Sequence, residues 1–288
     1  MSEAMVSKAD KVKYRRPLNA QQVRVLHALY WYRFCTSKQL AAMLKKDSHK
    51  TIQNKLQILE AQNLINKRYD KSYKLAGRSA EYYITPKGAR ELEKLKPKAT
   101  NEWATKSLYK NKTVSNDFLL HCITITDTAL KLNAIYGDKI QVIPKSYMVQ
   151  YSTFPAWTPD LYLKLTVRAQ DTPQLYFLDV WDGSKPFFVT VRKTRNYVTF
   201  KDRGYWEEGA DEEDYPYPAV LAICNDQQTQ KKLNRQMKRI LNDEDDEMLF
   251  ATTTMQQLDE ATKPTEKLWL RIDADDAPEK VSLKGIYL

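Results

Sequence analysis

Residues 48–57 carry the side chains best suited to reading DNA bases. Ile52, Leu56 and Leu59 recur at helical spacing, so they would face a core and leave the polar residues of the same helix outward. Amide side chains can bond adenine bidentately, while ammonium groups and a helix N-terminus suit phosphate or guanine. The candidate DNA contacts on this outward face are Ser48, His49, Lys50, Gln53, Asn54 and Gln57. Every amphipathic helix has a polar outer face, so the pattern alone leaves a purely structural role open.

Three short helices would position this polar face. An N-cap at Asn19 predicts the first helix, and Thr36 or Ser37 would cap the second. Asp47 or Ser48 would cap the third, which carries the candidate contacts. The tight connections between these helices predict a helix-turn-helix.

A wing follows the third helix. Two strands, LINKRY and AEYYIT, are joined by the polar loop DKSYKLAGRS. Pro86 then fits the first turn of a fourth helix, because its missing N–H costs nothing there. This order predicts a winged helix-turn-helix over residues 18–98. Candidate contacts from the wing to the DNA backbone or minor groove are Lys71, Lys74 and Arg78.

Positive charge is concentrated at the start of the chain. Residues 1–110 hold 24 Lys and Arg against 9 Asp and Glu, a net charge of +15, whereas the other 178 residues hold 22 against 27, a net charge of −5. Such a division is expected where one module meets a polyanion and the other does not. The basic arm at residues 1–17, expected to be disordered alone, adds Arg15 and Arg16 to the candidate DNA contacts. A solvated basic surface, or contact with an acidic protein, is the alternative.

Several classes of chemistry have no support in the sequence. Phosphate-binding loops, dinucleotide fingerprints, zinc-protease motifs and the serine-hydrolase elbow are all missing. The three His lack neighbouring Cys or His, so they predict no metal site, and we expect no cofactor. Three widely spaced Cys fit reduced thiols, and no apolar segment suits a membrane span or a leader. We therefore expect a cytoplasmic protein without membrane contact.

A second unit is expected after a polar, irregular connector at residues 99–112. A long apolar helix would come next and carry Asp117 and His121 one turn apart, a spacing that favours a structural pair. Strand signals then form a meander (KIQVIPKSYMVQY, DLYLKLTV, QLYFLDVWD), followed by alternating helices and strands. This order predicts an α/β domain with a mixed sheet over residues 113–272 and a polar tail at 273–288.

One ordered set of segments carries a family resemblance. TPDLYLKL is followed by QLYFLDVWDGS and a basic helix that contains Tyr. With the winged helix-turn-helix and the long helix before them, these segments resemble the plasmid replication-relaxation family over roughly residues 18–258. The resemblance implies a degenerate PD-(D/E)XK-like nuclease fold, with the PD on one strand and an acidic residue on the next. Pro159 and Asp160 match the PD, and Asp179 stands at the first acidic position of the family's Glu-x-Asp pattern.

Nuclease activity in such a fold needs two carboxylates on Mg²⁺ and a basic residue beside them. Asp160 and Asp179 would be the catalytic acids and metal ligands, but Trp181 occupies the place of the lysine in D-x-K. Lys185, or Arg192 and Lys193 on the following helix, would have to supply the missing charge. Otherwise both carboxylates end strands and satisfy loop amides, and this structural role is the one we expect.

We expect a non-enzymatic, sequence-specific binder of double-stranded DNA from a plasmid or conjugative element. It would act as an accessory factor at a replication or transfer origin, or as a transcriptional regulator. The α/β domain would hold contacts with a second copy of the chain, or with a relaxase or replication protein. The alternatives are a Mg²⁺-dependent endonuclease targeted by the winged helix, and a protein-interaction scaffold.

Overall fold

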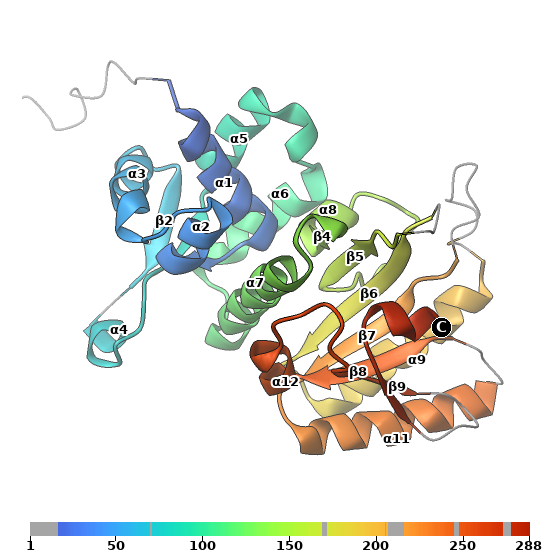
Figure 1. Cartoon of the computed structure of the whole chain (residues 1–288). Helices are drawn as coiled ribbons and strands as arrows, with labels where there is room; N and C mark the ends of the chain where they lie inside the picture. The colour runs from blue at the N-terminus through green and yellow to red at the C-terminus, as the bar shows by residue number, and fades with distance from the viewer. Residues whose placement is uncertain are drawn as a thin grey trace, which may run out of the picture.

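The chain forms a helical N-terminal part and a seven-stranded sheet with helices packed against it (Figure 1). The computed structural model describes residues 17–69, 71–168, 172–204, 206, 216–244, 248–272 and 278–288. The basic arm, with Arg15 and Arg16, lies outside the described residues. The fold class is the expected one, a winged helix-turn-helix followed by a mixed-sheet α/β domain.

Helices surround a small antiparallel sheet in the N-terminal part. The helices are α1 (Ala20–Tyr32), α2 (Ser37–Met43), α3 (Lys50–Ala61) and α5 (Pro86–Leu95). The strands are β1 (Cys35–Thr36), β2 (Ile65–Arg68) and β3 (Glu81–Ile84), in the order β1-β3-β2. Apolar side chains of these helices and strands share one core, which fixes α3 in position.

Local capping explains where the first helices begin. The Asn19 side chain accepts from the Gln22 backbone N–H, and Gln22 bonds back to Asn19. Thr36 and Gln39 repeat this capping box at α2. Each cap is worth about 1 kcal/mol. Pro86 occupies the first turn of α5, as expected.

The expected cap of α3 at Asp47 or Ser48 is wrong. His49 is the N-cap, and its side chain makes no capping bond. Its backbone is already α-helical, with φ −61° and ψ −22°, so the extended geometry that a side-chain cap requires is missing. The Ser48 hydroxyl accepts only from the Lys50 N–H, at 3.2 Å.

The polar loop expected in the wing contains a short helix, α4 (Lys71–Leu75). Tyr73 stabilises this helix, because its ring is buried and its hydroxyl donates to Glu81 at 2.7 Å. The Arg78 guanidinium lies over the same ring, 4.4 Å from its centroid. These contacts fold the loop onto β3.

The connector at residues 99–112 is helical, which corrects the expectation of an irregular linker. It follows η1 (Pro97–Ala99) and comprises α6 (Glu102–Leu108) and η2 (Tyr109–Lys112). Ala104 and Leu108 are buried in the N-terminal core, and the Tyr30 hydroxyl donates to the Asn101 carbonyl at 2.8 Å. The buried apolar side chains thus order the segment, although most of its residues are polar. The domain boundaries themselves stay a prediction.

The large sheet has the strand order β10-β9-β8-β7-β6-β5-β4. Its strands are β4 (Ile140–Pro144), β5 (Leu161–Leu165), β6 (Gln174–Trp181), β7 (Ala219–Cys224), β8 (Phe250–Thr254), β9 (Trp269–Ile272) and β10 (Glu279–Val281). Strands β4, β5 and β6 form the expected antiparallel meander, β6 to β8 are parallel, and β9 and β10 are antiparallel. The sheet is therefore mixed.

Both faces of this sheet are covered. The remaining helical elements are α7 (Asn116–Tyr136), η3 (Gly137–Lys139), α8 (Lys145–Met148), α9 (Phe187–Asp202), α11 (Gln227–Glu244), α12 (Met255–Glu260) and η4 (Lys284–Tyr287). Residues along β6 alternate between the two cores, with Tyr176 and Leu178 in the core that contains α7 and Phe177 in the core that contains α9 and α11. Asp179 follows the parity of Phe177, which turns it toward α9.

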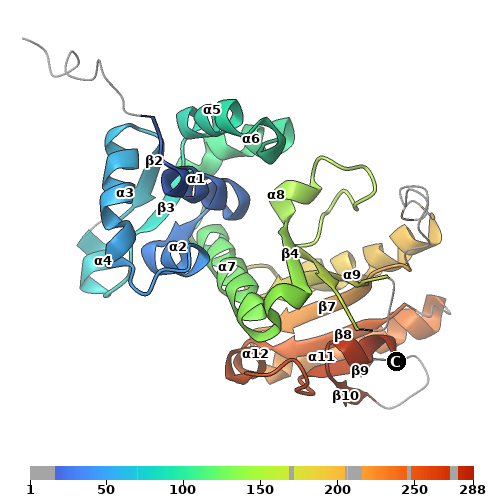
Figure 2. The same cartoon turned by 45° about the horizontal axis from the view of Figure 1, so that its top comes forward.

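Helix α7 lies between the two parts of the chain (Figure 2). The Gln39 amide of α2 donates to the Asp127 carboxylate at 2.8 Å and to the Ile123 carbonyl at 3.0 Å. Phe34 and Leu119 share a small buried cluster across the same boundary. The winged helix-turn-helix is therefore packed on the α/β domain through α7.

The polar tail expected at residues 273–288 is described over 278–288. There β10 joins the edge of the sheet and η4 follows it. Leu283 and Ile286 are fully buried, and the Tyr287 hydroxyl bonds to the Leu175 carbonyl. A few apolar side chains hold the segment despite its polar neighbours.

Candidate functional site

Helix α3 presents its polar residues on the side opposite the core. Ile52, Leu56 and Leu59 are buried, as the helical spacing predicts. Of the polar residues, Lys50, Asn54 and Gln57 are exposed and Ser48, His49 and Gln53 are half-buried. Neither Gln53, Asn54 nor Gln57 uses its amide in a hydrogen bond to another described residue. These amides are free to bind a ligand.

The basic residues of the wing are of two kinds, exposed lysines and an arginine that makes contacts within the fold. Lys71 and Lys74 are exposed on α4. Arg78 bonds to Glu81 at 2.8 Å and stacks on Tyr73, so its guanidinium holds the wing together. In both views α3 and α4 lie on the side of the N-terminal part that faces away from the large sheet (Figures 1 and 2).

Asp160 and Asp179 meet on neighbouring strands of the α/β domain. Asp160 immediately precedes β5, and Asp179 lies on β6, with only 5% and 3% of their surfaces exposed. The Asp160 N–H donates to Asp179 Oδ1 at 3.2 Å, and the Val180 N–H donates to Asp160 Oδ2 at 3.0 Å. The two carboxyl groups therefore converge, as the resemblance implies, and each is bonded to backbone amides.

Helix α9 supplies a lysine and a tyrosine to the same place. Lys193 and Tyr197 are one turn apart, so they share the face that meets β6. Lys193 Nζ lies 2.5 Å from Asp179 Oδ1, and the Tyr197 hydroxyl donates to Asp179 Oδ2 at 3.0 Å. Burial lowers the pKa of Lys193, but Asp179 and Asp160 more than offset this and raise it above its usual value. Lys193 is thus a buried ammonium paired with Asp179.

His121 completes the cluster and corrects a sequence expectation. Its pair is not Asp117, which is exposed in the first turn of α7, where a helix N-terminus favours a carboxylate. His121 Nδ1 lies 2.7 Å from Asp182 Oδ2, and Nε2 lies 3.5 Å from Asp160 Oδ2. Burial would lower the pKa of His121, but Asp160 and Asp182 raise it to about 9. His121 is therefore cationic at neutral pH.

Together these charges keep Asp160 ionised. Burial would raise the pKa of Asp160, whereas Lys193 and His121 hold it below its usual value. The pKa of Asp182 is also lowered against the effect of burial, because His121 and Ser184 bond to its carboxylate. The cluster thus joins three carboxylates, Asp160, Asp179 and Asp182, to two cations, Lys193 and His121.

This arrangement does not fit the Mg²⁺ ion that an active PD-(D/E)XK site requires. Both Asp179 oxygens are occupied by Lys193 and Tyr197, and Mg²⁺ needs free oxygen ligands in octahedral geometry. In the part of the chain that the structure describes, no three His, Cys, Asp or Glu side chains are grouped to hold a metal ion. Lys193 reaches the carboxylates, but Lys185 is exposed and pairs with no described acid.

Beside the cluster is a pocket that sequence reasoning missed. It has a volume of about 1070 Å³ and lies between α1 and α6 on one side and α8 and the segment before β5 on the other. Its walls include Trp31, Trp103, Tyr151 and Trp157. These rings come from distant segments without a shared motif, so no local signal in the sequence could have grouped them.

The chain was compared with curated proteins and with solved structures. No curated protein matches the chain in sequence. Among solved structures, a mutant of ZitR from Lactococcus lactis is 20% identical, with a TM-score of 0.24, over 40% of this chain and 73% of that one. The restriction endonuclease FokI bound to DNA is 12% identical, with a TM-score of 0.30, over 85% of this chain and 45% of that one.

Two further findings concern membrane-spanning helices and the family of the chain. Among the described residues, no helix is both long and apolar enough to cross a membrane. The family model described as replication-relaxation matches residues 26–212, which is more than half of the chain. The protein therefore belongs to the replication-relaxation family, and its function is related to DNA.

Proposed function

We propose that the protein binds double-stranded DNA sequence-specifically through its winged helix-turn-helix and that it is not a nuclease. The observation that carries this proposal is the outward face of α3, where Gln53, Asn54 and Gln57 have no partner among the described residues. Their amides can bond adenine edges in the major groove, while Lys50 suits a phosphate or guanine. Ser48 and His49 lie at the start of the same helix.

The charge distribution supports this reading. The net charge of +15 over residues 1–110 suits a polyanion. Lys71 and Lys74 on the wing would contact the DNA backbone or the minor groove. Arg15 and Arg16 would add contacts from the basic arm. A protein scaffold with an acidic partner is the competing reading, and the salt dependence of DNA binding separates the two.

The role of the α/β domain follows from its buried charges. Because Asp160, Asp179 and Lys193 satisfy one another, we assign them to the stability of the domain and not to catalysis. The domain would then contact a second copy of the chain, a relaxase or a replication protein. The process would be replication, transfer or transcriptional control of a plasmid or conjugative element. Buried free thiols at Cys35, Cys122 and Cys224 suit a cytoplasmic location.

Selection of binding sites from a random duplex library tests the proposal. On the selected site, Gln53→Ala and Asn54→Ala should each cost roughly 1 to 3 kcal/mol of binding free energy, with little change on random DNA. Gln141→Ala, which removes an exposed glutamine from β4, is the matched control. An unchanged ratio of specific to random affinity in both α3 variants would show that another element reads the bases.

Two further measurements use the same DNA. The logarithm of the affinity should fall by about 0.9 per phosphate contact with the logarithm of the salt concentration, and weak salt dependence would favour the scaffold. Incubation of supercoiled DNA with Mg²⁺ or Mn²⁺ should give no nicking. Nicking that disappears in folded Asp160→Ala and Asp179→Ala would establish the nuclease instead.

A further inference from the structure

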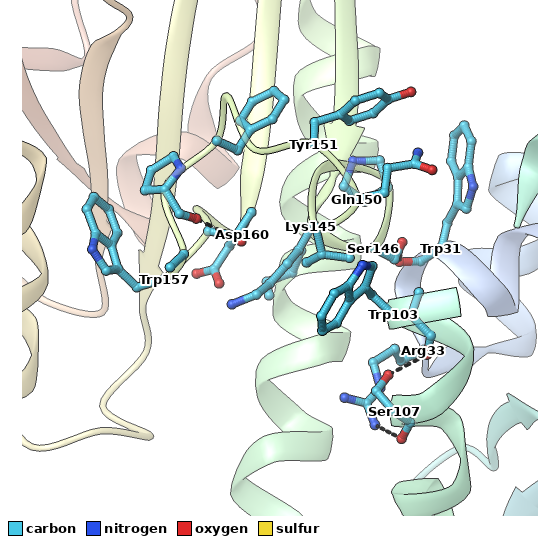
Figure 3. Close-up of a pocket in the computed structure, with 18 of the residues that line it drawn as sticks. Trp31, Arg33, Trp103, Ser107, Lys145, Ser146, Gln150, Tyr151, Trp157 and Asp160 are labelled. Carbon is cyan, nitrogen blue, oxygen red and sulfur yellow. Dashed lines mark hydrogen bonds between the residues drawn. The ribbon is translucent and has the colours of Figure 1, made fainter. Parts of the chain in front are cut away.

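The pocket beside the carboxylate cluster exposes aromatic rings that the two cores do not use. Trp103 on α6 is 67% exposed, and Tyr151 is 43% exposed. In Figure 3, Trp157 and Trp103 lie on opposite sides of the pocket, with Asp160 and Lys145 between them. The volume of about 1070 Å³ is at the upper end of that of ligand pockets. Large exposed rings around a cavity mark an interaction site.

Several of these rings are held in place by neighbouring rings. Trp157 packs at right angles to Tyr197, with ring centroids 4.4 Å apart. Tyr151 packs on Tyr147 at 5.4 Å, and Tyr147 contacts Trp31 at 6.1 Å. A ligand that stacks on these walls would therefore meet rings that are already ordered, which lowers the entropic cost of binding.

Positive charge dominates the lining. Among the described lining residues Asp160 is the only acid, and its buried carboxylate lies 3.5 Å from His121 Nε2. The remaining cationic lining residues are Arg33, Lys145, Lys185 and Arg203. Arg33 is bonded to Asn111 and Ser107, but the other three form no ion pair with a described residue.

Lys145 is one of the lining cations without an ion-pair partner among the described residues. Its side chain is exposed in the pocket, and the cations near it are Lys193 and Lys185. An anionic ligand in the pocket would relieve the repulsion among these cations. Rings for stacking together with free cations favour a ligand that has both bases and phosphates.

We propose that this pocket binds an unpaired segment of DNA, whose bases stack on Trp103 and Tyr151. The phosphates would be held by Lys145, Lys185 and Arg203. Duplex DNA already stacks its bases on one another, whereas an unpaired strand exposes base faces to such rings. This site is separate from α3, which faces away from the sheet, so duplex binding and single-strand binding can fail independently.

Fluorescence anisotropy with a labelled dT oligonucleotide of about 12 nucleotides tests the site in the full chain. Trp103→Ala should weaken binding about fivefold or more, because loss of one stacked base has at least that effect. Tyr109→Ala is the matched control, since Tyr109 is 65% exposed on the adjoining η2 and does not line the pocket. Lys145→Gln, compared with exposed Lys139→Gln, tests the phosphate contact.

Three outcomes support the proposal: loss of dT binding in Trp103→Ala but not Tyr109→Ala, a larger loss in Lys145→Gln than in Lys139→Gln, and unchanged dT binding in Asn54→Ala. The proposal is overturned if dT does not bind, or if Trp103→Ala and Tyr109→Ala bind it equally. Tighter binding of a matched uridine oligonucleotide would also overturn it, because RNA would then be the ligand. Circular dichroism checks that each variant folds.

Discussion

Polar side chains have different roles on α3 and where β5 and β6 lie side by side. On α3 the amides of Gln53 and Asn54 lack partners among the described residues and face outward. At these two strands, Asp160 and Asp179 are almost fully buried and bonded to backbone amides, a lysine and a tyrosine. A polar group that already makes its hydrogen bonds within the fold has few donors or acceptors left for a ligand. Candidate contacts therefore differ from structural polar groups in whether their hydrogen bonds are made within the fold, and not in residue type.

The strongest test of this contrast is Lys193→Met. Removing Lys193 leaves Asp179 buried without its charge partner, which should lower the free energy of unfolding by about 3 to 5 kcal/mol. Urea denaturation measures the change. Lys185→Met is the control, because exposed Lys185 has no described ion-pair partner and should change stability by less than about 0.5 kcal/mol. Equal stability of the two variants would remove the structural role assigned to the cluster.

The pH dependence of stability sharpens the same contrast through His121. Its pKa rises from 6.5 in the unfolded chain to about 9 in the folded one, so folding favours the protonated form. The resulting stabilisation is complete below about pH 6.5 and is lost as the pH rises through 9, with a total of roughly 3 kcal/mol. In urea melts, the stability difference between the wild type and His121→Asn should therefore shrink over this interval.

His27→Asn is the matched control for that experiment. Burial and Lys96 lower the pKa of His27 to about 4, so the contribution of this residue is present above pH 6.5 and is lost as the pH falls toward 4. The stability difference between the wild type and His27→Asn should therefore change below pH 6.5, whereas that for His121→Asn changes above it. A constant difference between wild type and His121→Asn from pH 6 to 10 would contradict the ion pair with Asp182.

The smallest expected effects come from the wing, where both kinds of polar residue occur side by side. Arg78→Ala should lower the free energy of unfolding by about 1 kcal/mol, because Arg78 bonds to Glu81 and covers Tyr73. Lys74→Ala should leave stability unchanged and reduce the salt dependence of duplex binding by about one phosphate contact. If Lys74→Ala lowered stability and Arg78→Ala reduced only the salt dependence, Lys74 would be the structural residue and Arg78 the phosphate contact.

The sequence predicts features that depend on neighbouring residues and misses those that join distant segments. The spacing of Ile52, Leu56 and Leu59 is local, so the outward face of α3 could be predicted. Asp182 lies 61 residues from His121, and only the fold brings them together. The i,i+4 pair with Asp117 was therefore the wrong choice.

A few apolar residues decide the structure of two segments whose composition is mostly polar. In the connector, Ala104 and Leu108 reach the N-terminal core, and in the tail Leu283 and Ile286 reach the sheet. Their burial orders segments whose other residues are polar. The PD position and Asp179 could be placed on adjacent strands through the family resemblance, but the bond from Lys193 could not, because it depends on how α9 packs on β6.

The packing of α7 against both parts of the chain fixes the orientation of the winged helix-turn-helix relative to the α/β domain. Gln39 bonds to Asp127, and Arg68 on β2 bonds to the Val114 carbonyl and to Asn116, so the winged helix-turn-helix is tied at separate points and cannot swivel about a single link. If α3 binds in the major groove as proposed, this packing would hold the α/β domain in one direction relative to the DNA axis. The α/β domain would then lie at a fixed distance along the DNA, and at a fixed rotation about its axis, from the base sequence that α3 contacts.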